Sequence, residues 1–79
     1  MVTKDRDMLY YDFDYLQKRL GEETGENVVY IYNERFDVLG LRFERFTIAI
    51  HRISEKIEYM QKLIEDVSER YFTMCEEGY

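Results

Sequence analysis

The sequence is poor in the residues that build disulfides, metal sites and catalytic centres. Its 79 residues include one cysteine, Cys75, one histidine, His51, and no proline or tryptophan. A lone cysteine cannot form a disulfide within the chain, and a structural zinc site needs several cysteine or histidine ligands. No glycine-rich phosphate loop or nucleophile motif is present. We therefore expect no enzyme activity, no metal and no cofactor, and a protein that acts by binding.

Long apolar runs are also missing, since the longest covers only residues 28–32. A membrane span needs about 18–20 apolar residues. The opening residues, Met-Val-Thr-Lys-Asp, lack the apolar stretch of a secretion signal. A protein with one cysteine and no such signal is expected in the cytoplasm, with no membrane contact.

Basic residues are outnumbered, with 11 lysines and arginines against 17 acids and a net charge of −6. Negative charge repels nucleic-acid phosphates, so direct nucleic-acid binding is not expected, although the acidic ends leave nucleic-acid mimicry open. Residues 28–54 alone are slightly basic, with four arginines and three acids. A weaker alternative function follows, in which an oligomer sequesters a small anionic ligand through Arg35, Arg42, Arg45 or Arg52.

Apolar residues recur at helical intervals near the N-terminus. A helix over residues 4–20 is predicted by four of them at intervals of four, three and four, on one helical face: Leu9, Phe13, Leu16 and Leu20. Gly21 stands where a helix end favours a left-handed residue. Residues 21–27 contain two glycines and no apolar side chain, which predicts a loop.

From residue 28 to 75, apolar residues alternate intervals of three and four, which is the heptad pattern of a coiled coil. This favours an all-α fold, in which a short N-terminal helix joins a long heptad helix with a break near Gly40. One short helix cannot cover so long a seam, so we expect a homo-oligomeric bundle. Its seam would comprise Phe36, Phe43, Phe46, Ile50, Ile53, Ile57, Met60, Ile64, Val67 and Tyr71.

A competing pattern predicts a small α+β fold. Residues 28–32 are five strand-favouring residues in a row, and residues 46–50 alternate with period two. Gly40 would then lie in a turn, whereas inside a helix it costs about 1 kcal/mol. This alternative has short strands within 28–50 and a C-terminal helix. Both readings give one domain over residues 1–79 and a helix over 51–75.

The aromatic and acidic segment 10–15 is the best candidate for a binding surface. Tyrosine and methionine are enriched in the cores of protein interfaces. We expect a partner to contact Met8, Tyr11, Asp12, Asp14 and Tyr15, although a second contact within the fold would use these residues equally well.

A polar trio on the predicted C-terminal helix carries side chains that can bind a divalent metal. His51, Glu55 and Glu58 lie close to one helical face, but helical di-metal sites place a glutamate three residues before the histidine, where Ile48 stands. We expect a solvated polar stripe instead.

The expected function is that of a small acidic regulatory or inhibitory protein. It would occupy a surface on another protein of unknown identity, as accessory proteins of phages and mobile elements do. The alternative is a structural helical protein that assembles with copies of itself.

Overall fold

The chain folds into a helix, a three-stranded sheet and a helical C-terminal segment. The computed structural model describes residues 6–78, with side chains from Leu9 onward. The elements in chain order are α1 (Arg6–Thr24), β1 (Val29–Asn33), β2 (Val38–Arg42), β3 (Thr47–His51), α2 (Ile53–Lys56), a 3-10 turn (Ile57–Tyr59) and α3 (Met60–Glu76).

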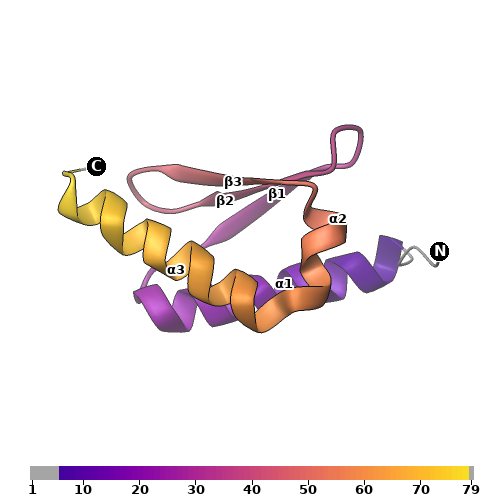
Figure 1. Ribbon diagram of the computed structural model, residues 1–79, viewed down its shortest axis with the longest axis horizontal. Helices are drawn as coiled ribbons and strands as arrows, with labels where there is room; N and C mark the ends of the chain where they lie inside the picture. Colours follow the sequence, from indigo (N-terminus) through magenta and orange to yellow (C-terminus); the bar gives the residue numbers. More distant parts are fainter. Residues whose placement is uncertain (1–5, 79) are drawn as a thin grey trace.

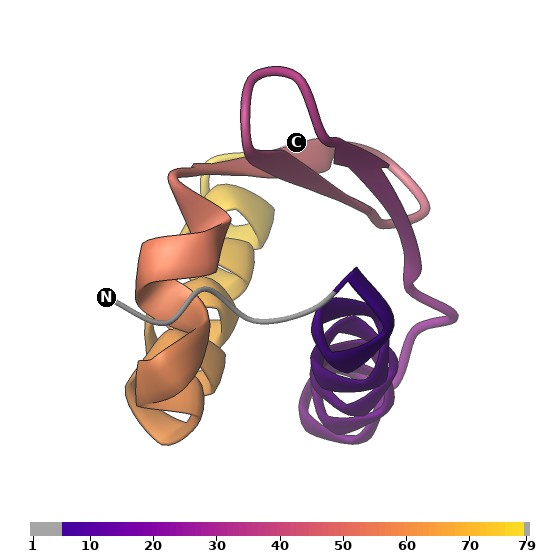
Figure 2. The same ribbon diagram turned by 90° about the vertical axis from the view of Figure 1, so that its right-hand side faces the viewer.

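The three strands form an antiparallel meander in the order β1-β2-β3. Tyr32 of β1 pairs with Leu39 of β2, and Leu39 pairs in turn with Ile50 of β3. Helices α1 and α3 both lie on the same face of this sheet, so the molecule has two layers (Figure 1, Figure 2). No element of the described chain covers the other face.

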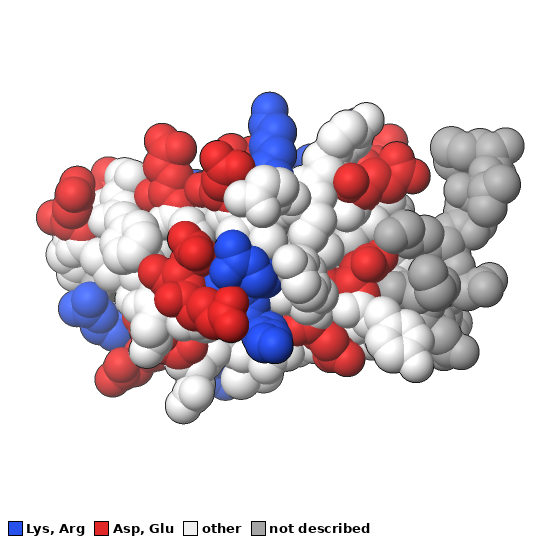
Figure 3. Space-filling model, turned by 90° about the horizontal axis from the view of Figure 1, so that it is seen from below, with Lys and Arg blue, Asp and Glu red and all other residues white. Residues whose placement is uncertain are grey.

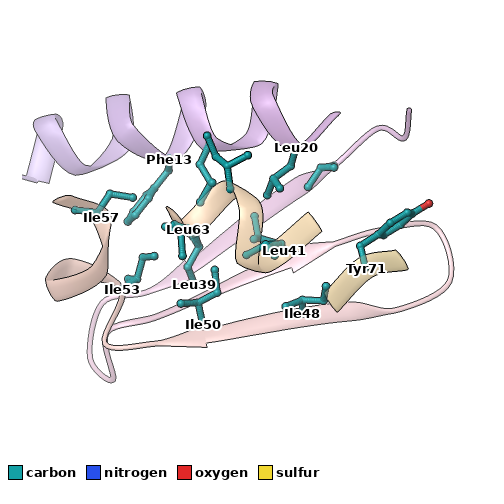
Figure 4. Packing of buried hydrophobic residues seen from close by; sticks show 14 of the residues in the cluster. Phe13, Leu20, Leu39, Leu41, Ile48, Ile50, Ile53, Ile57, Leu63 and Tyr71 are labelled. Atoms are coloured by element: carbon teal, nitrogen blue, oxygen red, sulfur yellow. The ribbon is translucent and has the colours of Figure 1, made fainter. Parts of the chain in front are cut away.

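The core lies between the sheet and the two long helices (Figure 4). Alternate strand residues point into it, as period two requires, and they meet the apolar stripes of the helices. The buried side chains include Phe13, Leu16 and Leu20 of α1, Leu39 and Leu41 of β2, Ile48 and Ile50 of β3, Ile53 and Ile57 near α2, and Leu63, Ile64, Val67 and Tyr71 of α3.

The all-α prediction, with its coiled coil, is wrong, and the α+β alternative describes the chain. Residues 29–51 form the sheet, because β-branched and aromatic side chains suit a pleated surface. Gly40 lies inside β2 and is not a turn residue. Of the ten proposed seam residues, Phe36 is exposed, and Phe46 and Met60 are half-buried. The other seven are buried in this chain's own core: Phe43, Ile50, Ile53, Ile57, Ile64, Val67 and Tyr71. The apolar pattern is therefore not one helical seam, and it no longer requires an oligomer to cover it.

The predicted first helix and its buried stripe are confirmed, but α1 continues past Gly21 to Thr24. The left-handed residue that ends it is Gly25, with φ 76°, whose N–H donates to the Gly21 carbonyl at 2.8 Å. Gly21 serves close packing instead, because a Cβ there would lie 3.2 Å from the Glu26 carbonyl oxygen.

Tyr71 of α3 connects one end of the sheet to α3 and to the segment that follows α1. Its ring packs against Phe43 and Phe46 with centroids 4.8 and 5.5 Å away. Its hydroxyl donates to the carboxylate of Glu26, whose other oxygen accepts the Glu44 N–H at 2.8 Å. These hydrogen bonds, first that from Tyr71 and then that from Glu44, lower the pKa of Glu26. The loops after α1 and β2 are thus held against α3.

Candidate functional site

The solvent face of α1 carries the two tyrosines predicted to meet a partner. Tyr11 and Tyr15 are 71% and 50% exposed, and they lie one turn apart on the side opposite the buried stripe. Asp14 is exposed beside them and accepts a hydrogen bond from Tyr30 at 2.9 Å. Asp12 is half-buried on a flank, and the Met8 side chain lies outside the described part of the chain. The structure thus groups Tyr11, Asp14 and Tyr15 and sets Asp12 apart.

Tyr10 has a different role from its neighbours in the aromatic segment. Its ring packs on Phe13, Tyr30 and Tyr32, with centroids 5.8, 6.4 and 6.2 Å away. Tyr10 and Phe13 therefore join α1 to β1, and only Tyr11 and Tyr15 are left for contacts outside the chain.

The second exposed surface, which the sequence reading missed, is the uncovered face of the sheet. We call it the outer sheet face and define it by the nine strand positions that point away from the helices. They form three rows across the strands: Val29, Arg42 and Thr47; Ile31, Gly40 and Ala49; Asn33, Val38 and His51. Val29 and Ile31 are 52% and 64% exposed, and the middle row is apolar throughout.

Two of the three residues in the middle row have little or no side chain. Gly40 has no side chain and Ala49 only a methyl group, whereas larger residues precede and follow them along β2 and β3. The flanking positions on one strand, Val38 and Arg42, are about 13 Å apart at the usual rise per residue.

The outer sheet face has no acidic residue, although the protein carries a net charge of −6. Arg42 lies at one end of the face and His51 at the other. Seen from the helix side, by contrast, acidic and basic side chains are interleaved (Figure 3). Ion pairs there include Arg19 with Glu22 and Glu23, at 2.9 and 3.5 Å. The sheet layer therefore presents solvent with a face that has no acidic side chain, whereas the helix layer presents acidic and basic side chains together.

A raised turn borders the outer sheet face. The connection between β1 and β2, residues 34–37, rises on the side away from the helices (Figure 1, Figure 2). It carries Phe36, which is 65% exposed, with the Arg35 guanidinium 5.3 Å from its ring centroid. The turn therefore exposes an aromatic side chain with a cation beside it.

Asp37 holds this turn in place. It adopts a left-handed backbone conformation, φ 53°, and its carboxylate accepts hydrogen bonds from the Tyr32 hydroxyl at 2.9 Å and the Ser54 N–H at 3.2 Å. Its carbonyl oxygen accepts the Ile53 N–H at 3.1 Å. Asp37 therefore caps the start of α2 from a distant part of the sequence, and it fixes the turn before any partner arrives.

The half-buried tyrosines Tyr30 and Tyr32 give the fold a predicted sensitivity to alkali. Burial raises the pKa of Tyr30 and of Tyr32 to about 12, helped by the hydrogen bonds to Asp14 and Asp37. The unfolded chain loses these protons at about pH 10 while the folded chain keeps them, so the free energy of unfolding should fall between about pH 10 and 12. Denaturant unfolding at a series of pH values measures this. Tyr30→Phe should reduce the slope, and a wild-type stability that is constant to pH 12 would contradict it.

The four arginines considered for an anionic ligand do not share a site. Arg42 and Arg45 lie at the end of the sheet that bears the β2–β3 loop, whereas Arg35 and Arg52 lie at the other end. In the part of the chain that the structure describes, no three histidine, cysteine or carboxylate side chains gather as metal ligands. None of the described helices has the length and apolar composition needed to cross a bilayer.

Compared with protein-family models, with curated proteins and with solved structures, the chain matches none. The two exposed surfaces are therefore the basis for any statement about function.

Proposed function

We propose that this protein acts by binding another protein, with the outer sheet face as its main docking surface. The observation that carries the proposal is the exposure of Val29 and Ile31 on a sheet face that no helix covers. Antiparallel sheets with one solvated face usually alternate apolar residues inside with polar residues outside. Here the middle row of the outer face is apolar, which is typical of a surface that a partner covers.

The size of the face indicates a transient interaction of the regulatory or inhibitory kind. Five-residue strands extend about 16 Å, and three strands span about 10 Å from the first to the third. With the raised turn this amounts to a few hundred Å² per partner, below the roughly 800 Å² of a standard interface. The proposed location of the protein is the cytoplasm, as inferred from its single cysteine.

The charge of the face restricts the partner. Arg42 borders the apolar row, so a partner surface with a carboxylate beside an apolar centre complements it. A basic partner surface would place like charges together.

The experiment compares two matched variants in binding to native cytosol. Ile31→Glu changes the outer sheet face, and Tyr59→Glu places the same residue in the helical layer, where the side chain is also 65% exposed. A tagged wild-type protein captures the partner, mass spectrometry identifies it, and titration of the purified partner gives its affinity.

We expect Ile31→Glu to weaken that affinity by at least about 2 kcal/mol, roughly thirtyfold in Kd, as loss of an interface anchor does. Tyr59→Glu should leave it unchanged, and both variants should melt close to the wild type. Equal partner binding by Ile31→Glu and wild type would refute the proposal.

A further inference from the structure

Strand β1 is an edge of the sheet, because the strand order is β1-β2-β3 and β1 pairs only with β2. An edge strand presents unpaired N–H and C=O groups with which another strand can form hydrogen bonds. The described chain places no further strand beside β1. These groups point sideways, within the plane of the sheet, so the edge is a separate surface from the outer sheet face. Its chemistry selects extended backbone.

The register of the sheet identifies which groups of β1 point outward. In an antiparallel ladder, hydrogen-bonded pairs and non-hydrogen-bonded pairs alternate. The Phe43 N–H donates to the Phe46 carbonyl oxygen at 2.8 Å, so this facing pair is a hydrogen-bonded one. Two positions back along the register, Leu41 also directs its backbone groups to β3, and Gly40 therefore directs its own to Ile31 of β1. The geometry agrees, because a Cβ on Gly40 would lie only 3.6 Å from the Ile31 carbonyl oxygen.

Tyr30 and Tyr32 therefore direct their backbone N–H and C=O groups away from β2 and toward the free edge, since these directions alternate along a strand. No other described residue donates a hydrogen bond to these groups or accepts one from them. The two side chains lie on the helix side of the sheet, where their hydroxyls donate to Asp14 and Asp37. The edge is thus held rigid while its backbone groups stay unpaired.

The sequence of β1 lacks the features that usually protect an edge, which are charges, proline or a bulge. Residues 27–33 contain no charged residue, proline or glycine, and β1 pairs with β2 without a bulge. The other edge differs, because β3 is preceded by Arg45 and followed by Arg52. An antiparallel pair of two β3 strands would hold an arginine from each copy at both ends. Strand β1 is therefore the edge suited to pairing.

We infer that β1 pairs with β1 of a second copy, antiparallel and centred on Ile31, to give one continuous sheet across a twofold axis. Full overlap of the five-residue strand Val29–Asn33 sets Ile31 opposite itself. Tyr30 of each copy then exchanges N–H and C=O hydrogen bonds with Tyr32 of the other, which pairs every outward group of the two residues. The contact uses the backbone of the edge, so it goes beyond the proposed function and does not depend on it.

The residues around β1 favour this register with a second copy. Within the strand, no facing residue carries a charge. Glu34, the first residue after the strand, would lie opposite Val28 of the other copy. A pair centred on Tyr30 would instead set Glu26 opposite Glu34, and like charges directly opposite each other destabilise a strand pair. The register centred on Ile31 avoids that repulsion.

The contact is small, so the dimer should be weak. Five facing residues bury at most a few hundred Å² per copy, below the roughly 800 Å² of a standard interface, so pairing requires concentrations toward millimolar. Asp14 and Lys18 of α1 line a groove beside Val28 and Val29, so the charges bordering the edge have both signs and salt should have little effect. The same edge is used by both copies, which closes the assembly at a dimer.

Disulfide trapping tests the register. Ile31→Cys, in a Cys75→Ser background, sets two thiols opposite each other in a non-hydrogen-bonded pair, where Cα atoms lie about 4.5 Å apart. Val29→Cys is the matched control, because its side chain is exposed on the same face, 52% against 64%. Two copies of that cysteine would lie about 13 Å apart along the strands.

We expect Ile31→Cys to form a covalent dimer in air at least about tenfold faster than Val29→Cys, because only its thiols are within bonding reach. A mixture of Val29→Cys with Asn33→Cys should crosslink as readily as Ile31→Cys, since these positions face each other in the register. Equal rates for Ile31→Cys and Val29→Cys would overturn the inference. Circular dichroism checks that each variant is folded.

Hydrogen exchange on the unmodified protein gives a test without substitutions. Once half of the chains are paired, exchange of the Tyr30 and Tyr32 amides should slow about twofold relative to dilute protein, because only the free chains exchange. Slowing at Thr47, Ala49 and His51 instead would show pairing through β3, and it would overturn the inference.

Sedimentation velocity from micromolar to millimolar protein measures the assembly itself. The wild type should pass from monomer to dimer and form nothing larger, with little change between low and high salt. A monomer at millimolar concentration would overturn the inference, as would species larger than a dimer. If such a monomer still loses its partner on Ile31→Glu, the proposed function stands without this dimer.

Discussion

Replacing Phe13 with alanine should lower the free energy of unfolding by about 3–5 kcal/mol, the usual effect of removing a buried phenylalanine ring. Phe13 is fully buried between the layers, and its ring lies 4.8 Å from that of Tyr32 and 5.6 Å from that of Tyr30. A chain of this length has a total stability of about 4–12 kcal/mol. The variant should therefore lose at least about a quarter of the total stability, which chemical denaturation followed by circular dichroism measures.

Phe36→Ala is the matched control, and it also separates the two folds. Phe36 is exposed on the raised turn, so its removal should change stability by less than about 0.5 kcal/mol. In the all-α fold Phe36 would be buried in the heptad seam and Phe13 in the stripe of the first helix, so both substitutions would be costly. A loss at Phe36 as large as that at Phe13 would contradict the α+β arrangement.

Replacing Asp37 with alanine should destabilise the protein by about 2 kcal/mol or more. The change removes the acceptor for the Tyr32 hydroxyl and the Ser54 N–H, and loss of a helix cap alone costs about 0.5–2 kcal/mol. Alanine also adopts the left-handed conformation at a cost of about 1–2 kcal/mol. Denaturation gives the total effect, and hydrogen exchange at the Ser54 amide reports the loss of the cap.

Asp37→Asn separates the backbone effect from the charge. Asparagine tolerates the left-handed conformation and keeps one oxygen acceptor, so it should lose less than half as much stability as the alanine variant. Unchanged stability and unchanged Ser54 exchange in Asp37→Ala would show that this carboxylate does not organise the turn.

The heptad pattern predicted a helical C-terminal segment, but the structure starts it at Ile53 and interrupts it with the 3-10 turn Ile57–Tyr59. The pattern was wrong for the middle of the chain, and the register of the sheet explains why. Tyr32 pairs with Leu39, seven residues later, and Leu39 pairs with Ile50, eleven residues later. Seven and eleven are sums of the heptad intervals of three and four, so cross-strand neighbours imitate a helical stripe. The pattern passes over Leu41 and Ile48, which are buried beside Leu39 and Ile50 at the period of a strand.

The binding surfaces were predictable to different degrees. The solvent face of α1 follows from helical geometry, because the buried stripe from Leu9 to Leu20 determines which side of the helix faces away from the core. The role of that face in binding stays a prediction. The outer sheet face depends on two facts that no local pattern contains. One is the pairing of strands that brings Ile31, Gly40 and Ala49 together, and the other is the packing of both helices on a single side.

The position of α3 after the three strands affects the order in which the protein can fold during synthesis. Chains emerge from the ribosome N-terminus first. Helix α3 supplies Leu63, Ile64, Val67 and Tyr71 to the core, so the strands emerge before half of their cover exists. Until then the sheet exposes part of its core-facing apolar side as well as the apolar middle row of the outer sheet face, and its two edges are free, which are sites of aggregation. A product truncated before residue 60 keeps that exposure permanently, and we expect it to aggregate or be degraded.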